Sequence, residues 1–518
     1  MTNPGNEESS VQRLSQRLAS LSQDQRTLFA LRLKNEKARQ ARPALIPELT
    51  ERSLFPLSLA QERLWFLYQL QPDNTDYNIC SVIRLSGVIN RRALWNALHE
   101  IVQRHEILRT TFAYVEDQPM QVVKADVVIH LPCIDLARLS PDEQETQIKR
   151  LAIQDARRPF NLGSGPVIRY LLLRSGAHEH VLIQTVHHIV CDGWSMRLLM
   201  EEFMTIYTAY ARAEPGMAVA LPARPAIHYG DFAVWQRSVL QGKALDADIA
   251  YWQKQLAGVS KLQFPAHYRA VETLSVHGAR QFFAIPASTT EALRALSRSE
   301  DATLFMTLLA GFQALLHLLT AQDDISIGVS VANRTRAEME RLIGFFVNIL
   351  ILRTDLSGNP TFRTLLQRVR ETTLNAYSHQ NLPFDRLIAL LEPERAKHAT
   401  PLVTVGFDYQ KDKKRLLQLP DLQVEFIELE NGRPQFDLTL RIIDEGHLLY
   451  GRLDYKASMF QEKLVLAMLE HYCVLLQEIA AHPEALLLEI MPAASGRVQV
   501  GHSAQDGNVD VFAFETNI

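Results

Sequence analysis

Apolar residues recur along this chain with two different spacings. Residues 94–108 carry them every third or fourth position, which predicts an amphipathic helix. Residues 181–186 form a short continuous apolar run, which is typical of a buried strand, and residues 325–331 and 346–352 have the same character. Helices and strands that alternate in this way predict a mixed α/β fold.

The same pattern divides the chain into four parts. Residues 1–45 are polar, but Ser22 and Gln25 form a capping box ahead of several leucines, so a helical appendage is predicted there. Two α/β lobes of similar texture are expected at residues 46–225 and 226–494. Residues 495–518 contain too few apolar groups for a core, and a flexible tail is predicted.

Two helices are predicted near the middle of the second lobe. Ser288 and Glu291 have the spacing of a capping box, which predicts that a helix opens at Ser288. The apolar run 304–319 is interrupted by Gln313 and His317 and is shorter than a membrane span, so a buried helix is expected. No transmembrane segment is predicted.

Composition excludes several classes of function. The 518 residues include 54 Lys and Arg against 58 Asp and Glu, and a net charge of -4 gives no field for holding nucleic acid or an anionic membrane. Four cysteines without a C-x-x-C pair argue against a zinc site or a disulfide framework. The polar N-terminus lacks the features of a secretory signal, so the cytoplasm is the expected compartment.

Residues 181–195 contain the most informative pattern, a strand that runs into a turn and then a helix. His187 and His188 are neighbours on the strand and must point to opposite faces, so they cannot bind one metal ion together. One of them is therefore expected to be structural and the other available for chemistry. Asp192 and Gly193 occupy the turn, where an Asp hydrogen-bonds the local backbone or pairs with an Arg.

His187-His188-x-x-x-Asp192-Gly193 resembles the HHxxxDG motif of the condensation domains of nonribosomal peptide synthetases. Five further segments resemble the motifs of that family in the same order: SLAQERLW (58–65), RHEILRT (104–110), YGDFAVW (229–235), IGFFVN (343–348) and HQNLPFD (379–385). The order Asp192-Gly193-Trp194-Ser195 differs from the pattern of epimerisation domains, and the acidic motif of heterocyclisation domains is absent. Residues 399–402 match the last family motif only weakly.

The resemblance implies a fold and a site. It implies two chloramphenicol-acetyltransferase-like lobes in a V-shaped pseudodimer, with a central tunnel that two phosphopantetheine arms enter from opposite sides. His188 is the expected catalytic residue in mid-tunnel. The expected supporting residues are His187, Asp192, Gly193 and Arg104, with Asp192 and Arg104 forming a buried ion pair. Trp194, Ser195 and Asn348 are assigned to the tunnel wall, although Asn348 fits a capping role equally well.

The resemblance also implies an activity and partners. The chain would join a carrier-bound acyl or peptidyl thioester to an amine, or to a hydroxyl, in the biosynthesis of a secondary metabolite such as an antibiotic. It would bind no cofactor or metal of its own, and would act as a free-standing monomer on donor and acceptor carrier proteins, the acceptor being alternatively a free small molecule. The helix from Ser22, or the tail around Phe512 and Phe514, is expected to dock a carrier.

Three other interpretations of the same residues remain open. A related acyltransferase would take coenzyme A thioesters, and a catalytically silent member of the family would serve as an assembly platform. Cys191 adjoins a His and an Asp, as a nucleophile would, but neighbours in sequence do not by themselves form a triad.

Overall fold

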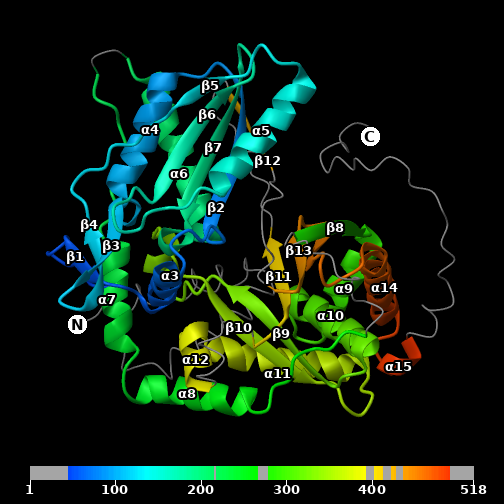
Figure 1. Cartoon of the computed structure of the whole chain (residues 1–518). Helices are drawn as coiled ribbons and strands as arrows, with labels where there is room; N and C mark the ends of the chain where they lie inside the picture. The colour runs from blue at the N-terminus through cyan, green and yellow to red at the C-terminus, as the bar shows by residue number, and fades with distance from the viewer. Residues whose placement is uncertain are drawn as a thin grey trace, which may run out of the picture.

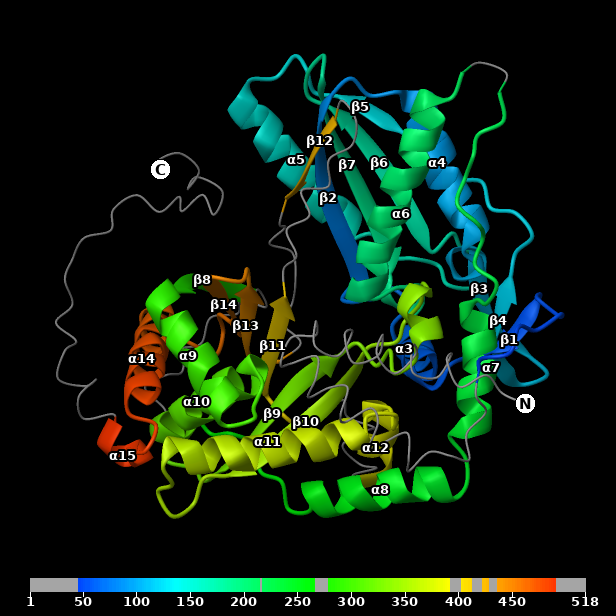
Figure 2. The ribbon, with the colours of Figure 1, turned by 180° about the vertical axis from the view of Figure 1, so that it is seen from behind.

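The computed structural model describes residues 45–214, 217–265, 278–391, 402–411, 422–427 and 436–490. These residues form two α/β lobes, which lie one above the other in Figure 1 and in the reverse view of Figure 2. The predicted helix from Ser22 and the predicted tail 495–518 lie outside the described residues.

The first lobe is built on a five-stranded sheet with a smaller three-stranded sheet beside it. The large sheet has the order β12 (Leu422–Ile427), β2 (Asn78–Gly87), β7 (Glu179–His187), β6 (Ile168–Arg174) and β5 (Cys133–Asp135). The small sheet has the order β1 (Leu54–Pro56), β4 (Gln118–Val123) and β3 (Thr110–Val115).

Helices cover both faces of the large sheet in the first lobe. Helix α5 (Pro141–Ala156) packs on one face, where Ile148 and Ala152 contact the apolar side chains of β2 and β7. Helices α4 (Arg91–Arg104) and α6 (Gly193–Arg212) lie together on the other face. Helices α3 (Leu59–Leu70) and α7 (Tyr229–Val239) and the 3₁₀ turns η1 (Glu106–Arg109) and η2 (His188–Val190) complete the lobe.

The second lobe contains one six-stranded sheet. Its order is β10 (Asn348–Asp355), β9 (Asp324–Val331), β11 (Val405–Lys411), β13 (Leu438–Asp444), β14 (Leu449–Lys456) and β8 (Gly278–Ile285). The remaining elements are α8 (Lys243–Leu256), α9 (Ala287–Ser299), α10 (Leu304–Thr320), η4 (Ala337–Arg341), α11 (Phe362–Ser378), α12 (Phe384–Leu391), α14 (Glu462–Ala481) and α15 (Leu487–Ile490).

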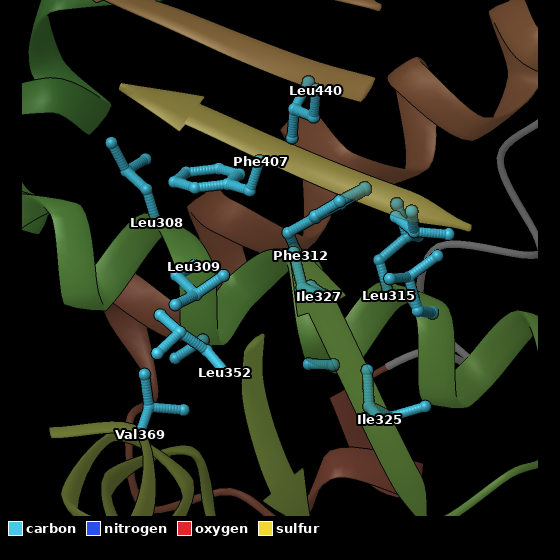
Figure 3. Packing of buried hydrophobic residues seen from close by; sticks show 14 of the residues in the cluster. Leu308, Leu309, Phe312, Leu315, Ile325, Ile327, Leu352, Val369, Phe407 and Leu440 are labelled. Atoms are coloured by element: carbon cyan, nitrogen blue, oxygen red, sulfur yellow. The ribbon is translucent and has the colours of Figure 1, made fainter. Parts of the chain in front are cut away.

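The core of the second lobe lies between this sheet and helix α10. Phe312 of α10 packs against Phe407 of β11, with ring centroids 6.0 Å apart, and Figure 3 shows the surrounding leucines and isoleucines. Burial alternates along β13 and β14 because one face of the sheet meets the helices and the other does not. The predicted buried helix at 304–319 is therefore confirmed.

Local sequence signals located these elements with two errors. The helix predicted at 94–108 is α4 only as far as Arg104, and the 3₁₀ turn η1 follows it. The strands predicted at 181–186 and 325–331 are β7 and β9, and the run at 346–352 falls mostly in β10. The capping box predicted at Ser288 is wrong, because α9 begins at Ala287 after Pro286 and has no side-chain cap. Proline at that position fixes the backbone ahead of the helix without a capping hydroxyl.

The two lobes share parts of the chain. Strand β12 comes from the second half of the sequence but pairs with β2 at the edge of the first lobe's sheet. Residues Met339, Leu342, Ile343 and Phe346 also belong to the first lobe's core, as does α7, which follows the predicted boundary at residue 226. We call this region of contact between the two lobes the seam, and the motif residues meet there.

One described helix, α14, has the length and hydropathy of a membrane span. Its residues Val465, Leu469 and Tyr472 are buried against the rest of the second lobe, and Tyr472 donates a hydrogen bond to the Leu308 carbonyl of α10. Helix α14 is thus part of the packed core of the second lobe.

Candidate active site

The segment with the two histidines leaves the end of β7 and enters helix α6 through a tight turn. Strand β7 ends at His187, the 3₁₀ turn η2 covers His188–Val190, and Asp192 is the N-cap of α6. The Asp192 carboxylate accepts a hydrogen bond from the Ser195 backbone N–H at 2.7 Å, which satisfies a donor left free at the helix start. The local backbone contact predicted for Asp192 is therefore present.

His187 lies in the interior of the first lobe. Its Nδ1 accepts a hydrogen bond from the Ile189 N–H at 3.1 Å, and its ring packs against Tyr77 and Phe160. Burial, with smaller contributions from His188 and Arg169, lowers the pKa of His187 to about 3. The ring is neutral at physiological pH, and the ring contacts given for it are with residues of the first lobe.

The His188 ring is held in one tautomer. Its Nδ1 lies 2.7 Å from the Cys191 carbonyl oxygen, and a carbonyl can only accept, so Nδ1 carries the proton. Burial lowers the pKa of His188, while the nearby Asp192 carboxylate opposes that shift. The imidazole is therefore neutral near pH 7, with the lone pair on Nε2.

His188 stands at the seam between the lobes. Unlike His187 it keeps part of its surface exposed, and its ring meets Phe345 of the second lobe edge-on, with centroids 5.0 Å apart. Phe345 in turn lines a small cavity of about 10 Å³, here named the Phe345 cavity, which has room for about one water molecule. Its other lining residues are Ala60, Phe232, Gln236, Asn333, Phe346, Val347, Asn348 and Pro383.

Asp192 pairs with Arg334, which follows strand β9 in the second lobe. Arg334 Nη2 lies 3.2 Å from Asp192 Oδ1, and both side chains are 2% exposed. The other carboxylate oxygen accepts the Phe346 N–H at 3.0 Å, and Arg334 also donates to Ser195 Oγ at 2.7 Å and to the Leu342 carbonyl at 2.7 Å. One buried carboxylate thus joins the turn after His188 to the opposite lobe.

The prediction that Arg104 is the partner of Asp192 is wrong. Arg104 lies in the last turn of α4 and binds Glu202 in the middle of α6, with Nε 2.6 Å from the carboxylate. It also donates to the carbonyls of Pro222 and Ala223 at 2.9 and 2.7 Å. Because α4 lies alongside α6, Arg104 reaches the body of that helix and not its N-terminus.

Trp194 and Ser195 hold the lobes together at the same place. Ser195 is fully buried, and its hydroxyl donates to the Gly344 carbonyl at 2.9 Å and accepts the Gly344 N–H at 3.1 Å. The prediction that Ser195 lines the tunnel is therefore wrong. The half-buried Trp194 donates its indole N–H to the Glu340 carbonyl at 2.9 Å.

Asn348 forms part of the cavity wall, but its polar atoms are engaged by backbone. Its Nδ2 donates to the Gln380 and Leu382 carbonyls, both at 2.9 Å, and its Oδ1 accepts the Phe384 N–H at 3.0 Å. Of the two roles open from the sequence, the capping role is the one these contacts describe. Asn348 therefore fixes the segment that carries Pro383.

Gly193 is the exposed first residue of α6. A Cβ atom at this position would meet nothing within 4 Å, so there is open space beside the turn that carries His188. Cys191, by contrast, is completely buried, and burial raises the pKa of its thiol well above the ordinary value. A thiol that stays protonated is a poor nucleophile, so the site does not support a nucleophilic role for Cys191.

Sequence reasoning missed the contact between Tyr229 and the loop at residue 344. The Tyr229 hydroxyl donates to the Phe345 carbonyl and accepts from Ser58 Oγ, 2.8 Å away. A Cβ atom on Gly344 would lie 1.9 Å from the Tyr229 ring, so only glycine permits this approach. Both residues stand in the family-like segments, but nothing in those segments indicates that they touch.

No group of three or more His, Cys, Asp or Glu side chains that could hold a metal ion occurs among the described residues. The site instead consists of one oriented imidazole, a buried ion pair behind it and a cavity that adjoins Phe345. Such an arrangement can position a substrate and accept a proton.

Comparison with known proteins places this site in a family. The family model named Condensation domain matches residues 51–496. This chain belongs to the condensation-domain family. The residues that carry the resemblance in the sequence all fall inside the matched region.

The relatives of this condensation domain include peptide synthetases. It is 39% identical over 477 residues to a linear gramicidin synthase of Brevibacillus parabrevis, a match that covers 92% of this chain and 6% of that protein. It is 37% identical over 476 residues to the phosphinothricin tripeptide synthetase PhsC of Streptomyces viridochromogenes, covering 91% and 43% of the two chains. The domain thus spans only part of each of these relatives.

Solved structures confirm the fold class. The X-domain from teicoplanin biosynthesis superposes with a TM-score of 0.75 at 23% identity, covering 86% of this chain and 99% of that one. The SgcC5 protein of Streptomyces globisporus gives a TM-score of 0.65 at 27% identity, with coverages of 83% and 100%. The two lobes are therefore those of a condensation domain, with its chloramphenicol-acetyltransferase-like architecture.

Proposed function

We propose that this condensation domain is an active enzyme that transfers an acyl or peptidyl group from a carrier-bound thioester to an amine. The observation that carries the proposal is the His188 ring at the seam between the lobes, neutral and fixed with its proton on Nδ1 and its lone pair on Nε2. In the reaction the amine nitrogen attacks the thioester carbon and the C–S bond breaks. The amine loses one proton and the departing thiol gains one.

Positioning contributes more to this reaction than proton removal does. An α-amine with a pKa of about 7.7 to 8.0 is already roughly a tenth to a fifth neutral at pH 7. Alignment of the two reactants supplies roughly 7 to 11 kcal/mol, whereas a general base contributes roughly 10²- to 10⁴-fold in rate. The Asp192–Arg334 pair and the Gly344–Tyr229 contact serve this alignment, since they fix both lobes around His188.

His188 orients the amine and takes a proton from the tetrahedral intermediate through Nε2. Because the Cys191 carbonyl binds Nδ1–H, the ring becomes an imidazolium only by accepting a proton on Nε2. The Asp192 carboxylate favours that charged form. His187 is buried behind the strand with Nδ1 already bonded, so it takes no part in the transfer.

The partners of this domain are a donor and an acceptor carrier protein whose phosphopantetheine arms enter between the lobes. The domain acts as a monomer in the cytoplasm and needs no further cofactor. The docking segments expected before residue 45 and after residue 494 lie outside the described residues, so truncation of each segment tests them. Loss of turnover with carriers, but not with free pantetheine thioesters, is the expected result for the segment that docks.

The direct test is mass spectrometry of both carriers after incubation with the domain. Transfer of the acyl group to the aminoacyl carrier, lost in a His188→Ala variant, is expected. Comparable rates with free acyl-coenzyme A would instead support a coenzyme A-dependent acyltransferase. A wild-type domain that yields no product with either donor would support the assembly-platform alternative.

A hydroxyl acceptor is the second candidate. The structure of SgcC5, to which this chain is 27% identical, holds a naphthyl ethanediol, which is an alcohol. The same site would then form an ester, and His188 would have to act as a true base.

A further inference from the structure

Helix α3 begins with a buried capping box. Ser58 Oγ accepts the Gln61 backbone N–H at 3.1 Å, and Gln61 Oε1 accepts the Ser58 backbone N–H at 3.0 Å. Both residues are 0% exposed. These two bonds alone satisfy the start of the helix, so any further bond made by the same two side chains serves another part of the molecule.

Gln61 also binds the turn that carries His188. Its Nε2 donates to the Ile189 carbonyl, in the middle of η2, at 3.0 Å. The orientation of the amide is fixed, because Oε1 already accepts the Ser58 N–H and Nε2 also donates to Gln121 Oε1 at 3.3 Å. The residue that follows His188 is therefore tied to the first turn of α3.

Ser58 reaches the other side of His188 through Tyr229. The Tyr229 hydroxyl has one proton and donates it to the Phe345 carbonyl, so in the 2.8 Å contact between the two hydroxyls Ser58 is the donor. The ring of Phe345 meets the His188 ring edge-on. Ser58 therefore holds, through one phenol, the aromatic residue that packs against the imidazole.

Water cannot readily replace these bonds, because the groups that make them are buried. Tyr229 is 1% exposed and Ile189 is 0% exposed. A buried carbonyl that loses its donor has the full cost of desolvation left uncompensated. The carbonyls of Ile189 and Phe345 belong to segments on two sides of His188, and both depend on the four residues that open α3.

We propose that the α3 capping box is a positioning clamp for His188, in which Gln61 holds the turn that follows the imidazole and Ser58 holds Phe345 beside it. The inference rests on the proposed function, because it assigns both residues to the step that His188 performs. Ser58 and Gln61 are positioning residues that act through Tyr229 and the Ile189 carbonyl. Because both are fully buried, they contact no carrier, and their loss lowers kcat without changing KM.

Turnover of Gln61→Met and Ser58→Ala with both loaded carriers tests the proposal. In each variant kcat should fall roughly fivefold, the effect of about one lost hydrogen bond, with KM unchanged for both carriers. Ser140→Ala is the matched control, since it removes the serine of the capping box at α5 in the same lobe and should turn over as the wild type does. An equal fall in kcat in Ser140→Ala would mean that the loss of any cap impairs the enzyme, and would overturn the proposal.

Tyr229→Phe tests the second branch of the clamp without altering α3. The aromatic ring remains, and only the hydroxyl between Ser58 and Phe345 is lost. The value of kcat should fall as in Ser58→Ala, and the double variant should lose no more than either single variant, because both changes interrupt the same connection. Losses that multiply in the double variant would contradict the proposal. This variant also decides the question should Gln61→Met fail to fold.

His188→Ala removes the group that the clamp positions. The residual amide formation of this variant, followed in single turnovers, should be the same with and without Gln61→Met. An equal fractional loss in the two backgrounds would show that Gln61 supports the fold in general, and the assignment to His188 would be wrong.

Hydrogen exchange tests the clamp without catalysis. The Ile189 amide donates to His187 Nδ1 and the Cys191 amide donates to the His188 carbonyl, so exchange at both reports opening of η2. Gln61→Met should accelerate their exchange roughly fivefold and Ser140→Ala should leave it unchanged. Wild-type exchange in Gln61→Met would overturn the proposal. Accelerated exchange in a domain that forms neither amide nor ester would disprove the proposed function alone.

Discussion

Arg334 Nη2 lies 3.2 Å from Asp192 Oδ1, and this contact joins the N-terminus of α6 in one lobe to the loop after β9 in the other. The carboxylate also accepts the N–H groups of Ser195 and Phe346, so three elements converge on one buried side chain. The turn that carries His188 is therefore fixed relative to Phe345 by the same group that caps the helix.

Removal of either partner of this pair should destabilise the domain strongly. Breaking a buried ion pair costs about 3 to 5 kcal/mol, because the remaining charge is left uncompensated. In a double-mutant cycle from urea unfolding, Asp192→Asn and Arg334→Gln should together cost at least about 1 kcal/mol less than the sum of the single changes. Asp192→Asn and Arg104→Gln should be additive within about 0.5 kcal/mol. Additivity at 192 and 334 would contradict the network around Asp192.

Substitution of alanine for Gly344 and for Gly193 should have opposite effects on the free energy of unfolding. Gly344→Ala places Cβ 1.9 Å from the Tyr229 ring, so the loop with Phe345 must move, and we expect a loss of about 1 to 3 kcal/mol in the free energy of unfolding. Gly193→Ala meets nothing within 4 Å and lies in the first turn of α6, so stability should be unchanged or rise by up to about 1 kcal/mol.

The turnover of the variants further distinguishes the role of Gly193 from that of Gly344. If substrate passes through the open space beside residue 193, Gly193→Ala should reduce turnover while the melting temperature is maintained. Full activity of this variant would show that the donor thioester does not approach the turn. Replacing Tyr229 with leucine should relieve part of the cost of Gly344→Ala, since the aromatic ring is the group that the new methyl meets.

His187 should make stability depend on pH. Burial lowers the pKa of His187 to about 3 in the folded state, against about 6.5 in the unfolded chain. Between these values the unfolded state binds the extra proton, so the free energy of unfolding falls as pH decreases from about 6.5 towards 3. His187→Asn should reduce that slope by up to about 1.4 kcal/mol per pH unit.

The remaining slope has other sources, since burial also lowers the pKa values of His180 and His188. Burial also lowers the pKa of His228, to about 4, so part of the dependence should survive in His187→Asn. Chemical unfolding of the wild type and of His187→Asn at a series of pH values separates the contribution of His187 from the rest. A His187→Asn profile parallel to the wild type would contradict the buried, neutral state of this ring.

The sequence alone predicted the elements whose signals are local. Strand β7, helix α6 and helix α10 were found because their apolar patterns extend over most of each element, and Asp192 was placed at a turn because it lies between the predicted strand and the predicted helix. Ser288 shows the limit of such signals: its capping-box spacing is present, but Pro286 sets the start of α9.

The contacts across the seam could not be predicted in the same way. Asp192 and Arg334 are 142 residues apart, and no periodicity connects them, so the family-like segment containing Arg104 supplied the wrong partner. Tyr229 and Gly344 touch because two loops from different lobes meet. The pairing of β12 with the first lobe is equally non-local, since this strand follows β11 of the second lobe in the chain.

Single-turnover rates of the His188→Ala variant with matched amine and hydroxyl acceptors test the central claim most directly. An amine is partly neutral at pH 7, whereas a hydroxyl resembles water, with a pKa of about 15.7, and needs a base. Ester formation should therefore fall roughly 10²- to 10⁴-fold, and amide formation by a clearly smaller factor. Equal fractional losses for the two acceptors would contradict the assignment of His188 Nε2 as the proton acceptor.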